Sequence, residues 1–98
     1  MTLAQRRKRN ASMYHDLAQT SKALSSPRRL ELLDLLCQRP WTVEALAAEG
    51  RMSIANASQH LKILRSARLV NARKQGLFVE YSVARPEVCA MFRGFIQP

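Results

Sequence analysis

The residues best suited to chemistry lie between Arg51 and Lys74, where six cations occur and no acidic residue interrupts them. Short hydroxyl and amide side chains accompany these cations at Ser53, Asn56, Ser58 and Gln59. Amides can pair with adenine edges in a DNA major groove, and lysine or arginine can pair with guanine or phosphate. Because ordinary exposed helices mix charges of both signs, this stretch favours DNA binding over a simple solvated surface.

One short amphipathic helix, over residues 53–65, is predicted to carry most of these side chains. Ser53 suits the N-cap position, since its hydroxyl can accept a hydrogen bond from a free N–H of the first turn. Apolar residues recur at the spacing of one helical face: Ala57, Leu61 and Leu64. Polar and cationic residues recur at the same spacing on another face: Ser58, Lys62 and Arg65.

A second short helix is predicted just before it, with Thr42 as the N-cap and Gly50 as the residue that ends it. Two short helices joined by a tight turn form a helix-turn-helix. After Arg68 the apolar spacing changes from helical to alternating, which predicts strands over 69–73 and 77–83 with a turn over 74–76. Arg73 and Lys74 would then lie at the tip of a β-hairpin, as phosphate contacts or as ordinary loop cations.

The predicted fold is therefore mainly α with a β-hairpin wing (α+β), a winged helix-turn-helix over residues 12–98. A first helix is expected over 12–24, a central helix from Pro27 to just before Pro40, and a last helix from Pro86. The first and last helices are expected to form a homodimer that presents two recognition helices, about 34 Å apart, to an inverted repeat. Residues 1–11 are expected to be a basic disordered arm that can contact phosphate or the minor groove.

Composition agrees with a polyanion-binding domain. The chain has 98 residues and a net charge of +9, which attracts DNA or other polyanions. No apolar run approaches the roughly 18 residues needed to span a bilayer, so we expect a cytoplasmic protein without membrane contact. The histidines, His15 and His60, lie on different predicted helices, and no glycine-rich phosphate loop occurs. We therefore expect neither enzymatic activity nor a cofactor.

The sequence resembles the ArsR/SmtB family of winged-helix repressors. The resemblance rests on residues 22–33, on the Ser-Gln-His-Leu-Lys block that begins at Ser58, and on residues 69–70, Tyr81 and 86–88. It implies a homodimeric bacterial transcriptional regulator, a repressor that leaves its operator when an inducer binds. We assign Ser53, Asn56, Ser58 and Gln59 to base edges, and mainly phosphate contacts to four cations: Lys62, Arg65, Arg73 and Lys74.

The inducer is not implied as clearly. Some metal-sensing members use a cysteine box, but residues 42–47 contain no thiol. Other members use ligands on the last helix, but residues 86–96 contain no histidine or aspartate. No metal site is therefore expected. Another branch senses sulfur species or oxidants through two cysteines on the core and last helices, where Cys37 and Cys89 lie at shifted positions. These thiols are either a redox switch or small buried hydrophobes.

Two alternative functions stay open at this stage. One is a winged helix that binds protein, which predicts a neutral or apolar recognition surface. The other is a DNA-binding regulator of the same fold whose signal involves neither cysteine nor metal.

Overall fold

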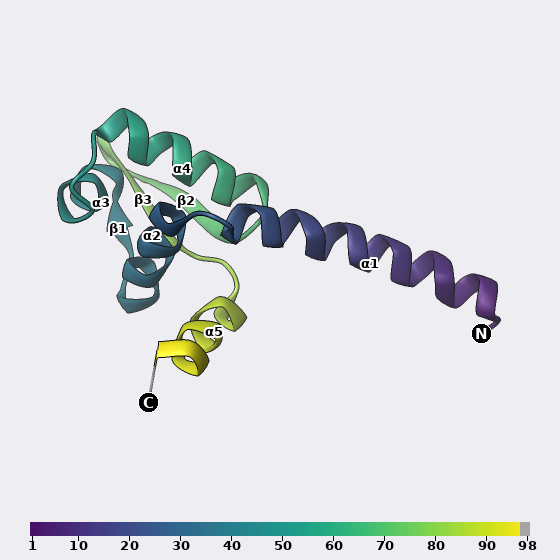
Figure 1. Ribbon diagram of the computed structural model, residues 1–98. Helices are drawn as coiled ribbons and strands as arrows, with labels where there is room; N and C mark the ends of the chain where they lie inside the picture. The colour runs from purple at the N-terminus through teal and green to yellow at the C-terminus, as the bar shows by residue number, and fades with distance from the viewer. Residues whose placement is uncertain (97–98) are drawn as a thin grey trace.

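The computed structural model describes residues 1–96 as five helices and one antiparallel sheet (Figure 1). The elements are α1 (Leu3–Leu24), α2 (Pro27–Gln38), β1 (Trp41–Thr42), α3 (Val43–Glu49), α4 (Ile54–Ser66), β2 (Val70–Gln75), β3 (Phe78–Val83) and α5 (Pro86–Ile96). The strands lie in the order β1-β3-β2. This confirms the predicted mainly helical fold with a hairpin wing; the last two residues of the predicted domain lie outside the described residues.

Three hydroxyl side chains cap the N-termini of the helices in the central bundle. The Oγ of Ser26 accepts the Arg29 N–H at 3.3 Å, and the Oγ of Ser53 accepts the Asn56 N–H at 3.0 Å. The Oγ1 of Thr42 accepts from a backbone N–H in the same way. Thr42 and Ser53 were predicted as N-caps, because a serine or threonine before an apolar stripe is a local signal.

The core forms where the apolar faces of α2, α3 and α4 meet the first residues of the hairpin. The leucines that are fully buried are Leu32, Leu33, Leu46, Leu61, Leu64 and Leu69. Each buried leucine contributes about 1.5–3 kcal/mol through removal of apolar surface from water. Trp41 closes the end of α2, since its Nε1–H donates to the Leu35 carbonyl at 2.9 Å. The core therefore holds α4 in place along one face only.

The first helix begins much earlier than predicted. Thr2 and Gln5 form a reciprocal capping box, and α1 then runs without glycine or proline to Leu24. The disordered arm expected over residues 1–11 is wrong for this structure, because strong helix formers and a cap favour a helix even without an apolar face. Within residues 1–96, no helix is both long enough and apolar enough to cross a membrane.

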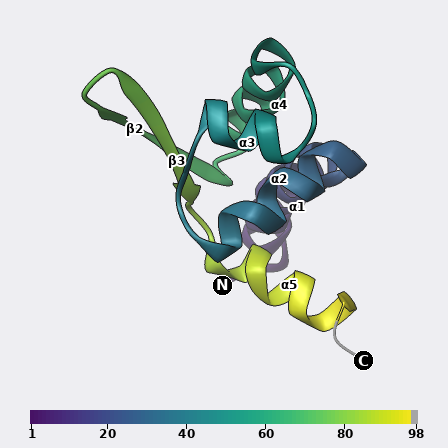
Figure 2. The same cartoon turned by 90° about the vertical axis from the view of Figure 1, so that its left-hand side faces the viewer.

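The hairpin turn also lies later in the chain than predicted. Gln75 pairs with Phe78, so the two-residue turn is Gly76-Leu77. A turn of this length favours glycine at a left-handed position, and Gly76 has a φ of 61°. Arg73 and Lys74 are therefore not at the tip, as predicted, but within β2. Figure 2 shows the paired strands projecting from the helical body.

The turn between α3 and α4 depends on Gly50 for space rather than for backbone freedom. Gly50 has a φ of −80°, whereas Arg51 takes the left-handed conformation with a φ of 54°. A Cβ on Gly50 would lie 2.9 Å from the Met52 Cε and 3.1 Å from the Leu46 carbonyl oxygen. The predicted helix end is correct in place, but the left-handed residue of the turn is Arg51 rather than the glycine.

Candidate nucleic-acid interface

Helix α4 has one buried face and one open face. Ala57, Leu61 and Leu64 have no exposed surface. The open face carries five of the predicted DNA contacts, all exposed: Asn56, Ser58, Gln59, Lys62 and Arg65. The structure therefore brings two amides, a hydroxyl and two cations onto one side of a rigid helix. A helix of this kind, about 10–12 Å wide, fits a DNA major groove about 12 Å wide.

Ser53 lies at the start of this surface, but its side chain already has a structural role. Its oxygen accepts the Asn56 N–H, which fixes the direction in which α4 leaves the turn. A hydroxyl has one donor and two acceptor lone pairs, so the Ser53 O–H can still donate. Arg51, exposed in the preceding turn, adds a cation beside it that the residue-by-residue assignment missed.

The two predicted hairpin cations do not act as a pair. Neighbouring residues of a strand point to opposite faces of the sheet, so Arg73 and Lys74 diverge. Arg73 lies directly opposite Glu80, and Lys74 lies opposite Val79. Directly opposed residues share a face, so the carboxylate weakens the field of Arg73 but not that of Lys74. The charge of Lys74 is therefore less offset by the facing strand than the charge of Arg73.

Arg29 connects the open face of α4 to the end of α1. Its Nε donates to the Ala23 carbonyl at 2.7 Å, and its Nη2 donates to the Lys22 carbonyl at 3.4 Å. Its Nη1 lies 3.5 Å from the Nδ1 of His60 on α4. His60 thus contacts the first turn of α2. No spacing in the sequence predicts these contacts, because Arg29 lies on α2 and its partners lie on α1 and α4.

Comparison with known proteins identifies the fold. Residues 26–72, from the N-cap of α2 into β2, match the family model described as "Bacterial regulatory protein, arsR family". The homodimeric winged helix-turn-helix DNA-binding domain of Mb0332 from Mycobacterium bovis superposes with a TM-score of 0.80. It is 39% identical, over 86% of this chain and 78% of that one. The chain belongs to the ArsR family.

Relatives of this ArsR-family chain are regulators of transcription. The HTH-type transcriptional regulator Rv0324 of Mycobacterium tuberculosis is 39% identical over 86% of the chain. The transcriptional repressor SmtB homolog of Synechocystis is 39% identical over 79% of it. The chain spans 37% of the length of the first and 58% of the second. These relatives agree with the prediction of a regulator rather than an enzyme.

In the ArsR-family fold of this chain, the two cysteines come together. Cys37 on α2 and Cys89 on α5 form a disulfide with a Cα–Cα separation of 5.6 Å. Both residues are half-buried. The bridge joins the central core helix to the last helix across 52 residues of sequence. Within residues 1–96, no three histidine, cysteine or acidic side chains are grouped as metal ligands.

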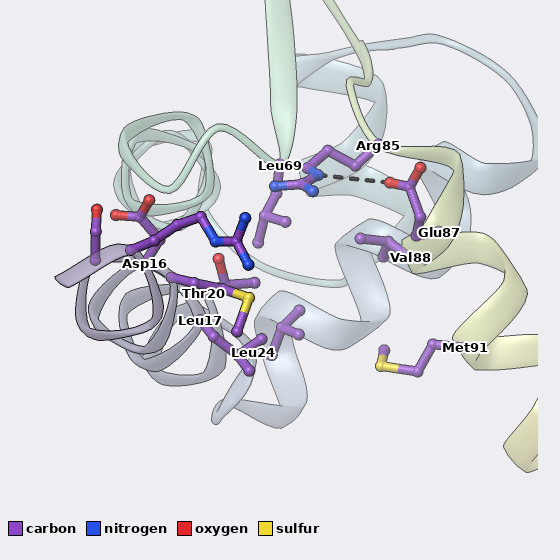
Figure 3. Close-up of a pocket in the computed structure, with 12 residues that line it drawn as sticks. Asp16, Leu17, Thr20, Leu24, Leu69, Arg85, Glu87, Val88 and Met91 are labelled. Atoms are coloured by element: carbon purple, nitrogen blue, oxygen red, sulfur yellow. Dashed lines mark ion pairs between the residues drawn. The ribbon is translucent and has the colours of Figure 1, made fainter. Parts of the chain in front are cut away.

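A groove between α1 and α5 is the second notable feature of this ArsR-family chain (Figure 3). Its apolar lining comes from both terminal helices and from the loop before β2: Met13, Leu17, Leu24, Leu69, Val88 and Met91. Arg85 and Glu87 form an ion pair at its rim, with 3.5 Å between Nε and Oε2. Leu17 is 59% exposed, so this apolar surface is not covered by the chain itself.

Proposed function

We propose that this chain is a homodimeric repressor that inserts α4 into the major groove of an inverted-repeat operator. The observation that supports it best is the open face of α4, where exposed amides and cations face away from a fully buried leucine stripe. The region from Arg51 to Lys74 has no carboxylate to repel DNA. Such a regulator acts in the cytoplasm, and that location is part of the proposal.

The side chains of α4 take distinct roles in this proposal. Asn56, Ser58 and Gln59 lie in its first two turns and contact base edges, with the Ser53 hydroxyl beside them. Lys62 and Arg65 lie farther along the helix and contact phosphates. On the hairpin, Lys74 contributes more than Arg73, because Glu80 lies opposite Arg73.

A second copy of the chain is the proposed occupant of the groove between α1 and α5. Met13, Tyr14 and Leu17 are each more than half exposed on α1, an apolar surface typical of a subunit interface. The related Mb0332 domain is homodimeric. Because α1 and α5 both contribute to the groove, a two-fold axis beside them brings the same surface of both copies together.

A thiol–disulfide switch at Cys37 and Cys89 is the proposed signal. The two residues meet the distance requirement for a bridge, which is a Cα separation below about 7 Å. Oxidation removes two electrons and two protons from the thiol pair; with hydrogen peroxide as the oxidant, the products are the disulfide and two waters. Because α5 belongs to the proposed dimer interface, the bridge constrains that helix against α2 and changes operator affinity.

The decisive experiment is fluorescence anisotropy with a duplex that carries the inverted repeat upstream of the protein's own gene. A scrambled duplex is the control, and each is titrated under reducing conditions and after peroxide treatment. We expect tight binding to the operator when reduced and weaker binding after oxidation. The variant Cys37→Ser should bind equally under both conditions. Equal affinity for operator and scrambled duplex would contradict sequence-specific regulation, and an oxidation effect that survives in Cys37→Ser would contradict the switch.

A further inference from the structure

A second groove lies on the other side of α1, between its last turns, the start of α2 and the open side of α4. Its polar lining consists of Gln19, Lys22, Arg29, Gln59, Lys62 and Ser66. The three charged residues among the lining are all cations. The ion pairs described within residues 1–96, Arg28–Glu31 and Arg85–Glu87, involve none of them. The groove is therefore a concentrated positive site.

Arg29 is held in the orientation that such a site needs. Each of its three nitrogens has one contact, with the carbonyls of Ala23 and Lys22 and with the His60 ring. A guanidinium has five N–H groups, so these contacts leave two for a ligand, counted over the described residues. Because the side chain is already ordered by the fold, less conformational entropy is lost when an anion binds there.

The groove continues directly from the proposed recognition surface. Gln59 and Lys62 belong both to the groove and to the open face of α4. At 3.6 residues per turn, Ser58 and Arg65 lie on one flank of the open face of α4, Asn56 and Ile63 lie on the other, and Gln59 lies between the two flanks. A helix that fills a major groove has one sugar–phosphate backbone along each flank. The backbone on the Ile63 flank lies against this groove, which Ile63 also lines.

We propose that the groove binds phosphate of the operator backbone, with Lys22 and Arg29 as DNA contacts outside the helix-turn-helix. This inference rests on the proposed function and extends its interface to α1. The ligand chemistry is a phosphate ester or a free phosphate anion, held by two cations and by neighbouring amide and hydroxyl groups. Because α1 also carries the apolar surface proposed for the dimer, one helix contacts both the second copy and the DNA.

Lys22→Gln tests the proposal, because the Lys22 side chain is exposed and its removal leaves the carbonyl contacts of Arg29 intact. We expect the slope of log affinity against log salt to become shallower by about 0.9, the value for one lost phosphate contact. Extrapolated from 1 M, that slope corresponds to about fivefold weaker binding at 0.15 M salt. Operator and random duplex should be affected alike.

Arg39→Gln is the matched control, since it removes one cation from the other end of α2, outside the groove and outside both terminal helices. It should leave the salt slope unchanged; an equal loss in both variants would mean that only net charge matters and would overturn the proposal. Gln19→Glu is a second test variant. It places a carboxylate in the groove and should weaken duplex binding more than Lys22→Gln does. Thermal melting by circular dichroism checks that each variant is folded.

The outcomes separate this inference from the proposed function. If the unmodified protein binds no duplex, the proposed function fails and the inference fails with it. If it binds the operator but Lys22→Gln keeps the full salt slope, only the inference is overturned. A final titration uses inorganic phosphate at constant ionic strength, observed by NMR. Shifts at Lys22 and Arg29 without any effect of Lys22→Gln on duplex binding would assign the groove to a free anion, against the proposal.

Discussion

Helices α1 and α4 are both amphipathic, but their apolar faces have different partners. The apolar stripe of α4 is fully buried against α2, α3 and the hairpin, with Leu61 and Leu64 at zero exposure. The stripe of α1 is open: Met13, Tyr14 and Leu17 are each more than half exposed, and Ala23 is its one buried residue. Figure 1 shows α1 leaving the helical body, which leaves most of its length without contact.

This contrast shows what amphipathic spacing indicates. The spacing indicates that one face of a helix must be buried, but it does not indicate whether the residues that bury it belong to the same chain. For α4 the cover is intramolecular, so its open face is held rigidly and can present polar groups at fixed positions. For α1 the cover must come from outside the chain, so we expect its apolar residues to affect association rather than folding.

Leu61→Ala should have the largest effect on stability. The side chain is completely buried, and its truncation leaves a cavity between α4 and the rest of the core. We expect a loss of about 2–5 kcal/mol in the free energy of unfolding, measured by urea titration. Leu17→Ala is the matched control on α1, where the same truncation should cost far less in the isolated subunit. Similar losses at low protein concentration would show that the two helices are equally anchored.

Leu17→Asp should separate folding from assembly. A carboxylate in the groove between α1 and α5 cannot be buried against a second copy without a large desolvation cost. Light scattering should therefore report a monomer, with the melting curve of a folded subunit. Operator affinity should fall by about 100-fold, because two linked half-site contacts become one. Ala11→Asp, which adds the same charge on another face of α1, should leave the dimer intact; a dimeric Leu17→Asp protein would refute the assignment.

The helix-turn-helix could be predicted because its signals are local. A hydroxyl N-cap, an apolar stripe and a glycine-containing turn all fall within a few residues, so both ends of α3 and α4 were found. The strand β1 could not be predicted, since two residues cannot show alternation and its pairing with β3 is set by the fold. The hairpin turn was misplaced for a related reason: a glycine marks a turn but does not say which position of the turn it occupies.

The candidate site likewise has a part that could be predicted from the sequence and a part that could not. The contacts on α4 are spaced along one helix, so their common exposure followed from helical geometry. The groove beside it combines Lys22, Arg29 and Lys62 from three helices, and no spacing in the sequence relates them. The proximity of Cys37 and Cys89 is of the same kind, because it depends on how α5 packs against α2.

Gln59→Ala tests whether the rigid face of α4 reads sequence. The amide is exposed in the middle of that face, where it can make two hydrogen bonds to one adenine. We expect a loss of about 1–3 kcal/mol in binding to the operator and little change on random duplex. Competition titrations with the two duplexes measure this difference. Equal losses on the two duplexes would mean that Gln59 contacts the DNA backbone. The main argument that α4 recognises the operator sequence would then be lost.

Lys74→Ala and Arg73→Ala should produce the smallest effects, and they extend the comparison to a third element. The hairpin projects like α1, but its strands are tied to the core at Val70 and Val83. Lys74→Ala should weaken binding to all duplexes and reduce the salt slope by about 0.9. Arg73→Ala should reduce it less, because Glu80 already offsets that charge across the strands. Glu80→Gln can be introduced both into the unmodified protein and into the Arg73→Ala variant. If it raises DNA affinity only in the unmodified protein, the carboxylate acts through Arg73. Equal gains in both proteins would mean that the carboxylate repels DNA directly.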